Sequence, residues 1–198
     1  EKNKEILKEF IDGKKLSKRH GAVSVMEFRE MGILSHALLN YLVRLGWSHG
    51  DQEIFSRDEL IEKFSLESVG KSAGVFNPEK LLWLNFHYMK SQPLSKLTDA
   101  VIPFIEAKGY PRPQDRPWLE KMIPTLRERA KTLTELVDLA RFYLSDEITL
   151  DEKAAKKFLT AEAREPMGQL ITGLSTLGEF TEQGIEQLFS GILQERGL

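Results

Sequence analysis

A helical fold is indicated most clearly by residues 35–46, SHALLNYLVRLG. Ser35 is a residue type that commonly caps a helix N-terminus, and Gly46 stands where such a helix would end. The leucines between them recur at spacings of three and four residues, which is the helical period: Leu38, Leu39, Leu42 and Leu45. We therefore predict a helix over 36–45 whose leucine stripe faces the core.

Signals for the start of a helix recur along the rest of the chain. Three pairs have the Ser/Thr-x-x-Glu spacing of a capping box: Ser24 with Glu27, Ser56 with Glu59, and Thr149 with Glu152. Asn77 and Pro78 provide a cap and a first helical residue for a helix that continues to Lys90. Further helices are expected up to Gly109, after the proline-rich connector 110–117, and over roughly 151–178 and 181–197. Apart from an allowance for two short strands near 50–56, no sustained alternation indicates a sheet, so the prediction is an all-α fold.

The chain is expected to have three parts. Residues 1–22 combine a short amphipathic helix over 1–11 with a basic loop. Residues 23–92 hold short helices joined by polar turns. Residues 93–198 form a second helical region, after a boundary near Ser91-Gln92-Pro93.

Composition limits the classes of function. The 198 residues have a net charge of −2 and contain no cysteine, so disulfides and thiolate metal sites are excluded. The histidines are far apart, so we expect no metal site, and we expect a reducing, cytoplasmic location. No apolar run approaches the length of a membrane span, and no membrane association is expected. A chain this close to neutral can bind nucleic acid only through local basic faces, here residues 14–20 and 127–131.

The first of these basic faces is the loop KKLSKRHGA, residues 14–22. Lysine and arginine donate charge-assisted hydrogen bonds to phosphate oxygens, and the flanking glycines let the backbone turn. The loop resembles the second signature of class I aminoacyl-tRNA synthetases, the Lys-Met-Ser-Lys-Ser loop, in its glutamyl-tRNA synthetase form. Three later segments strengthen the resemblance, which is specific from Asp12 to Tyr88: YLVRLGW (41–47), QEIFS (52–56) and FNPEKLLWLN (76–85).

The resemblance implies roles for the residues of the loop. Lys15 and Lys18 align with the two signature lysines and are the expected catalytic residues, which stabilise the phosphates of ATP while an aminoacyl-adenylate forms. In the intact enzyme, ATP is expected to bind together with Mg²⁺. Ser17 and Arg19 are the other expected phosphate ligands. Arg19 departs from the signature, which has serine at this position, and it adds a fork-shaped donor without removing the site.

The resemblance also implies a fragment. The nucleotide-binding domain that precedes the loop in the family is missing here, and the charged residues 1–11 differ from the apolar strand of the family. We therefore expect the C-terminal part of such an enzyme, inactive alone and incomplete at its C-terminus. Residues 23–92 would then form a helical unit that contacts the tRNA stem, and residues 93–198 a helical anticodon-binding bundle.

The second basic face supplies the candidate tRNA contacts. They are Arg116, Arg127, Arg129 and Lys131. An arginine can both stack on a splayed base and hydrogen-bond to its edge. The resemblance implies that an arginine in this region reads the third anticodon base, and the candidates are Arg127 and Arg129, of which Arg129 is preferred. The other interpretation is a solvated helix face balanced by Glu120, Glu128 and Glu135. The expected partner of a monomeric chain is tRNA-Glu, with tRNA-Gln left open, and no DNA.

Two alternatives stay open at this point. A glutaminyl relative would have an anticodon region resembling β-barrels. A helical protein-interaction module would have no RNA role at all. The aromatic residues do not decide between them, because their helical spacing favours a place in the core: Trp47, Trp83, Phe86 and Trp118.

Overall fold

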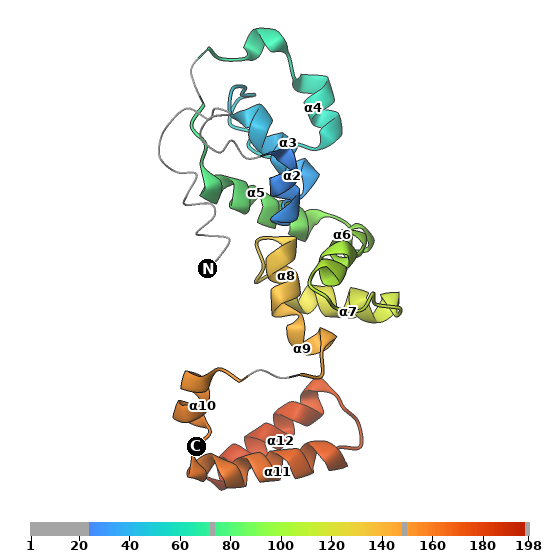
Figure 1. Cartoon of the computed structure of the whole chain (residues 1–198), viewed down its shortest axis with the longest axis vertical. Coiled ribbons are helices and arrows are strands. Elements are labelled where there is room, and N and C mark those ends of the chain that lie inside the picture. The colour runs from blue at the N-terminus through green and yellow to red at the C-terminus, as the bar shows by residue number, and fades with distance from the viewer. Residues whose placement is uncertain (1–23, 72–73, 148–149, 197–198) are drawn as a thin grey trace. The chain divides into compact units, whose positions relative to one another are not determined.

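The computed structural model describes residues 24–71, 74–147 and 150–196, and within these ranges every regular element is a helix (Figure 1). The chain divides into two compact units, residues 1–146 and 147–198. The all-α prediction is confirmed. The two strands allowed near 50–56 are absent from the described residues, where one isolated bridge joins Trp47 to Val69 instead.

The first half of the larger unit follows the capping signals closely. It contains α2 (Val25–Glu30), α3 (Ser35–Arg44), α4 (Arg57–Lys63), the 3₁₀ turn η1 (Leu66–Ser68) and α5 (Pro78–Ser91). Ser24 and Ser56 each form the predicted capping box with the glutamate three residues later. The side chain of Asn77 accepts a hydrogen bond from the backbone of Lys80, as expected of a cap. These helix starts are set by local chemistry alone.

The prediction that the leucine stripe of α3 faces the core is wrong in part. Leu39 and Leu42 are 43% and 47% exposed. The buried side chains of this helix are instead Ala37, Leu38, Asn40 and Tyr41. The predicted cap is also shifted, because Leu34 is the N-cap and Ser35 is the first helical residue.

Hydrogen bonds explain why a polar residue replaces leucines on the inner face of α3. The Asn40 Oδ1 accepts from the Phe55 backbone N–H at 2.8 Å and from the Tyr88 hydroxyl at 3.0 Å. The Asn40 Nδ2 donates to the Glu53 carbonyl at 2.9 Å. A buried amide with all these partners costs little, so α3 turns this side towards α5 and the 53–55 segment.

The second half of the larger unit has its own core. It is built from α6 (Leu94–Ala107), α7 (Arg116–Arg127), α8 (Leu133–Leu139) and the short α9 (Arg141–Leu144). Fully buried side chains from three helices meet there: Leu97, Val101 and Ile105 of α6, Leu119 and Ile123 of α7, and Leu136 of α8. Within α6 and α7 these side chains recur every four residues, so each helix turns one apolar face inward.

A hydrogen-bonded joint ties the two halves of the larger unit together. The backbone of Leu133 donates to the Gly32 carbonyl at 3.0 Å, which sets the start of α8 against the turn after α2. Asn85 of α5 reaches both sides, because its Oδ1 accepts from Leu34 at 2.8 Å and its Nδ2 donates to the Lys131 carbonyl at 2.7 Å. The predicted boundary near residue 92 therefore lies inside one compact unit.

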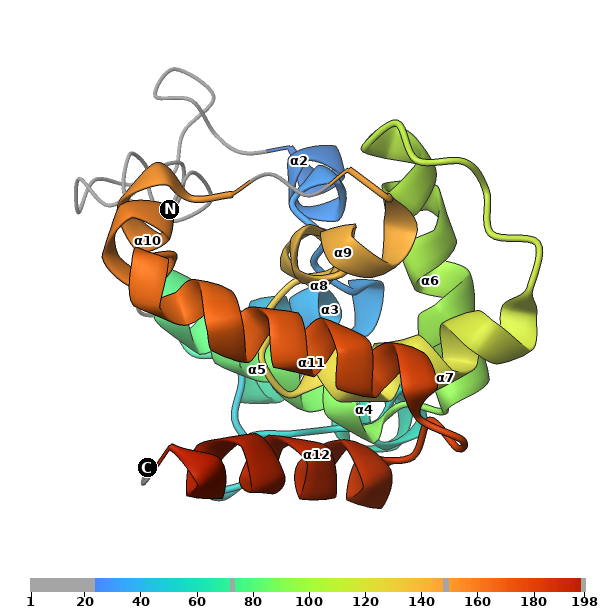
Figure 2. The same ribbon diagram turned by 90° about the horizontal axis from the view of Figure 1, so that it is seen from below.

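The smaller unit consists of α10 (Glu152–Phe158), the 3₁₀ turn η2 (Ala161–Ala163), α11 (Arg164–Thr176) and α12 (Glu182–Glu195). α11 and α12 lie side by side, with Gly173 close to Leu188 (Figure 2). The helix predicted over 151–178 is interrupted at 159–163. Asp151 is the N-cap of α10 and Glu152 is its first helical residue, so Glu152 is not at the third helical position that the predicted capping box requires. Thr149, the other residue of that box, lies outside the described residues.

The cap of α4 makes a testable prediction about pH. Hydrogen bonds from the Ser56 backbone, the Gln52 side chain and the Ser56 hydroxyl hold the pKa of Glu59 at about 2, below its ordinary 4.5. Because folding lowers this pKa, the carboxylate stabilises the fold above about 4.5, and the contribution is lost as the pH falls towards about 2. A carboxyl NMR titration should show Glu59 titrating near 2 in the wild-type chain. The S56A variant should shift the pKa upwards, and an unchanged pKa in S56A would contradict the assignment.

Candidate nucleic-acid interface

Two of the four sequence-predicted tRNA contacts, Arg129 and Lys131, lie in the turn between α7 and α8, residues 128–132, and Arg116 and Arg127 are the first and last residues of α7. The turn alternates between inward and outward side chains. Ala130 is fully buried and Thr132 is 1% exposed, whereas Arg129 and Lys131, each directly before one of them, are exposed. The turn therefore presents these two cations from an anchored backbone.

Side chains of neighbouring helices hold the backbone of this turn. Asn85 donates to the Lys131 carbonyl at 2.7 Å, and Glu135 accepts from the Lys131 backbone N–H at 2.7 Å. The Thr132 hydroxyl caps α8 by accepting from the Glu135 backbone at 3.0 Å. A cation held in this way loses little backbone freedom when it binds, which favours affinity.

The carboxylates that could have neutralised the turn are engaged elsewhere. Glu128 pairs with Lys90, Glu120 pairs with Arg116, and Glu135 binds the backbone of Lys131. Within the described residues, the Arg129 guanidinium and the Lys131 ammonium have no ion-pair partner. Two exposed, uncompensated cations on a fixed turn suit a polyanion such as RNA.

Arg116 has a different environment from Arg129. Its Nη1 lies 2.5 Å from Asp99, its Nε donates to Glu120 at 3.0 Å, and its Nη2 donates to the Ser95 carbonyl at 2.9 Å. The bond from Arg116 lowers the pKa of the Asp99 carboxyl. The guanidinium thus braces α6 against α7, and these contacts compete with any contact to RNA.

Arg127 lies between these two cases. It is the last residue of α7 and is half-buried, and its Nε is buried without a hydrogen-bond partner among the described residues. This orientation points part of the guanidinium into the protein. Of the four predicted contacts, Arg129 and Lys131 are thus the most accessible.

The predicted phosphate ligands lie outside the described residues. Lys15, Ser17, Lys18 and Arg19 all fall within residues 1–23, so their assignment stays a prediction. In the described ranges, no three histidine or acidic side chains gather as a metal site would require. No helix in those ranges is long and apolar enough to span a bilayer.

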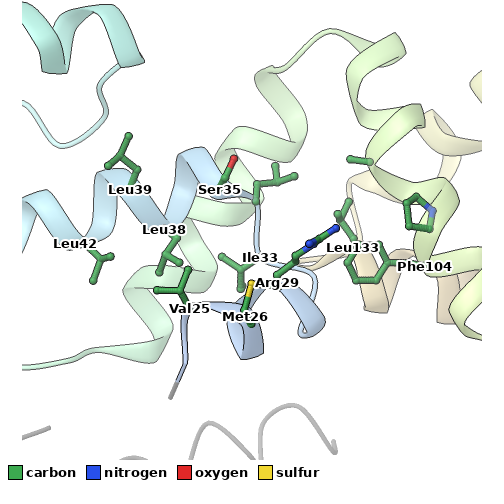
Figure 3. A pocket seen from close by; sticks show the side chains of 13 residues that line it. Val25, Met26, Arg29, Ile33, Ser35, Leu38, Leu39, Leu42, Phe104 and Leu133 are labelled. Carbon is green, nitrogen blue, oxygen red and sulfur yellow. The ribbon is translucent and has the colours of Figure 1, made fainter. Parts of the chain in front are cut away.

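An apolar pocket of about 520 Å³ lies between α2, α3 and α6 (Figure 3). Val25 and Met26 of α2 face Leu39 and Leu42 of α3 across it, and Phe104 closes another side. Among the lining residues that the structure describes, Arg29 is the one that carries a charge. So little polar chemistry does not suit a nucleotide or a phosphate, so we do not assign the RNA site to this pocket.

The predicted core positions of the aromatic residues are correct only in part. Trp47 is 3% exposed and packs on Phe55, as expected. Trp83 is 47% and Trp118 36% exposed, so their assignment to the core is wrong. The interior takes Leu84 and Asn85 instead of Trp83, because Asn85 must face the joint to make its hydrogen bonds. In the sequence, the position of this asparagine inside the apolar run LLWLNF (81–86) indicates that Asn85 could be buried and hydrogen-bonded.

Two family matches cover most of the chain. Residues 96–198 match the family described as Anticodon binding domain. Residues 4–83 match the family described as tRNA synthetases class I (E and Q), catalytic domain. Residues 84–95 lie between the two matched ranges.

Proteins that are similar over most of this chain are glutamate–tRNA ligases. The glutamate–tRNA ligase of Syntrophobacter fumaroxidans is 54% identical, and that of Geotalea uraniireducens is 52% identical, each over 94% of this chain. The chain spans about 40% of the length of these relatives. Among solved structures, the glutamate–tRNA ligase of Elizabethkingia meningosepticum, in complex with its amino acid, matches with a TM-score of 0.78 and 27% identity. That match covers 93% of this chain and 40% of the other.

Proposed function

Because the chain belongs to the anticodon-binding-domain family of glutamate–tRNA ligases, we propose that it is the tRNA-binding portion of such a ligase. Residues 23–92 contact the stem of the RNA, and residues 93–198 contact its anticodon. The observation that carries the proposal is the anchored turn with its uncompensated Arg129 and Lys131.

The whole enzyme would join glutamate to ATP, form glutamyl-adenylate, and transfer glutamate to the 3′ end of tRNA-Glu. In this proposal, Lys15 and Lys18 stabilise the charge that moves onto the departing pyrophosphate, with Ser17 and Arg19 as further donors. ATP enters as a substrate with Mg²⁺. The chain alone, which spans about 40% of its relatives, is proposed to be inactive, monomeric and cytoplasmic.

The proposal is tested by RNA binding measured on the purified chain. A gel shift with tRNA-Glu, tRNA-Gln and an unrelated tRNA should show binding that weakens steeply with salt, because bound counterions are released. Preference for tRNA-Glu over tRNA-Gln would define a discriminating parent enzyme. The absence of binding to every tRNA at low salt would contradict the proposal.

Arg129 is proposed to read a base of the anticodon. The R129A variant should bind tRNA-Glu about tenfold more weakly and should discriminate less against an anticodon-swapped tRNA, because one base contact is lost. Lys131→Ala should weaken binding to both RNAs alike, as expected for a phosphate contact. Arg112→Ala is the matched control, since Arg112 is exposed but paired with Glu106. Equal loss on both RNAs in R129A would argue against base reading.

A protein-interaction module is the second candidate function, and the apolar pocket of Figure 3 favours it. Exposed leucines such as Leu39 and Leu42 are typical of surfaces that bind another protein. The two functions make different predictions for tRNA binding. If the chain is a ligase fragment, the wild-type chain binds tRNA and the double variant Arg129→Ala/Lys131→Ala loses that binding. If the chain is a protein-interaction module, the wild-type chain itself does not bind tRNA.

A further inference from the structure

Three exposed aromatic side chains form a cluster at the far end of α7 from Arg129. They are Trp118 of α7 with Phe142 and Tyr143 of α9, which are 36%, 59% and 39% exposed. The ring centroids of Phe142 and Tyr143 are 4.4 Å apart, and those of Trp118 and Tyr143 are 6.3 Å apart. We call these three residues the aromatic cluster.

The rings of the aromatic cluster are held in place while they face solvent. Trp118 packs edge-on against Tyr143, and the Tyr143 hydroxyl lies 3.4 Å from the Thr125 hydroxyl. The short α9 that carries two of the rings is preceded by its N-cap residue, the fully buried Ala140. A rigid ring costs little entropy when another flat group stacks on it.

Two exposed cations flank the aromatic cluster, and the nearby Asp115 carboxylate is engaged as the cap of α7, where it accepts from the Trp118 backbone at 2.9 Å. Lys121, one turn after Trp118, and Arg141, next to Phe142, have no ion-pair partner among the described residues. The one carboxylate of α7, Glu120, is held by Arg116, and α9 carries no carboxylate. Exposed rings beside free cations favour a polyanion that has flat, apolar faces.

The aromatic cluster and Arg129 are associated with opposite ends of α7. Trp118, Lys121 and Thr125 follow one another at helical spacing on this helix, and Arg129 lies in the turn after it, where its backbone donates to the Leu126 carbonyl at 2.9 Å. At the helical rise, Trp118 and Arg127, the last residue of α7, lie about 14 Å apart along the axis. A stretch of a few nucleotides can span this distance.

We propose that the aromatic cluster is a stacking platform for unpaired bases of the bound RNA, with Lys121 and Arg141 contacting the adjoining phosphates. This inference rests on the proposed function and extends it from the charged turn to the whole outer face of α7. The bases of a duplex are hidden in their own stack, so the platform selects a loop rather than a stem. Stacking of a base on an aromatic ring does not depend on base identity, which leaves sequence reading to Arg129.

The experiment compares two anticodon-arm hairpins, one with a normal loop and one whose loop nucleotides are abasic. Affinity for the full chain is measured by fluorescence polarisation. Trp118→Leu and Phe142→Leu should each bind the normal hairpin about tenfold more weakly than wild type, because a stacking ring is lost. Neither should differ from wild type on the abasic hairpin, which keeps the phosphates but has no bases to stack.

Three controls separate stacking from other effects. Trp83→Leu removes an aromatic side chain of similar exposure from α5 and should change affinity for the normal and the abasic hairpin to the same extent, because no base stacks on it. Trp118→Phe and Phe142→Tyr keep a ring and should retain wild-type affinity. Circular dichroism should show the same helix content in every variant.

The outcomes distinguish the platform from the function on which it rests. If wild type binds the normal hairpin and both leucine variants bind it equally well, the platform is wrong while tRNA binding stands. Equal losses on the abasic hairpin would also overturn it, since the cluster would then act through the fold or be covered by protein. If wild type binds neither hairpin nor any tRNA, the proposed function fails, and the platform fails with it.

Discussion

Gly32→Ala is expected to lower the free energy of unfolding of the larger unit by about 2–5 kcal/mol, through backbone strain and a steric clash together. Gly32 has a φ of +83°, a region that residues with a Cβ adopt at a cost. A Cβ added there would also lie 2.6 Å from the Thr134 nitrogen and 2.7 Å from the Leu133 nitrogen. These are backbone atoms at the start of α8, so they cannot rotate away.

Gly109→Ala is the matched control for this prediction. Gly109 has nearly the same φ, +85°, but an added Cβ would meet nothing within 4 Å. Only the backbone strain remains, so a loss of about 1–2 kcal/mol is expected. Urea unfolding followed by tryptophan fluorescence measures both variants, since all three tryptophans lie in the larger unit. If both variants lose the same free energy of unfolding, the backbone of α8 does not lie as close to Gly32 as the structure has it.

Asn85→Leu is expected to destabilise the same unit by about 2–5 kcal/mol, because buried polar groups lose their partners. The Leu34 N–H and the Lys131 carbonyl would each lose a short hydrogen bond, and the Gly32 carbonyl a longer one of 3.3 Å. Leucine has a similar size but cannot replace any of these bonds. Because Asn85 holds the backbone of Lys131, tRNA binding should weaken as well, even at temperatures where the variant is folded.

Asn77→Leu provides the comparison for Asn85→Leu. Asn77 is exposed, and its side chain accepts one hydrogen bond, from the Lys80 backbone at 3.1 Å. The loss of such a cap costs about 1 kcal/mol. Thermal unfolding and tRNA affinity, measured on both variants, test the difference. A variant of Asn85 that loses no more stability than Asn77→Leu, and that binds tRNA normally, would exclude the positioning role.

Sequence patterns predicted the helices well where the information is local. The capping boxes at Ser24 and Ser56 and the cap at Asn77 are each made by residues within one helical turn. The prediction failed for the helix after Thr149, where Asp151 is the cap. Several residues near a helix start can serve as the cap, and spacing alone does not rank them.

The candidate interface was only partly accessible from the sequence. Arg129 and Lys131 could be named from charge and from the resemblance. The pairing of Glu128 with Lys90 could not, because these two residues are far apart in the chain, whereas Glu120 pairs with Arg116 one turn away on the same helix. That pairing is what leaves the cations of the turn uncompensated.

The sequence by itself determined the all-α class, the family and most helix boundaries, because caps, turns and helical periodicity depend on neighbours within a few residues. Only the tertiary structure decided which faces are buried. Asn40 and Asn85 lie inside while Leu39, Leu42 and Trp83 lie outside, since hydrogen bonds to distant backbone groups outweigh the hydrophobicity of single positions. The same long-range contacts fix the turn that presents Arg129 and bring Trp118 beside Tyr143.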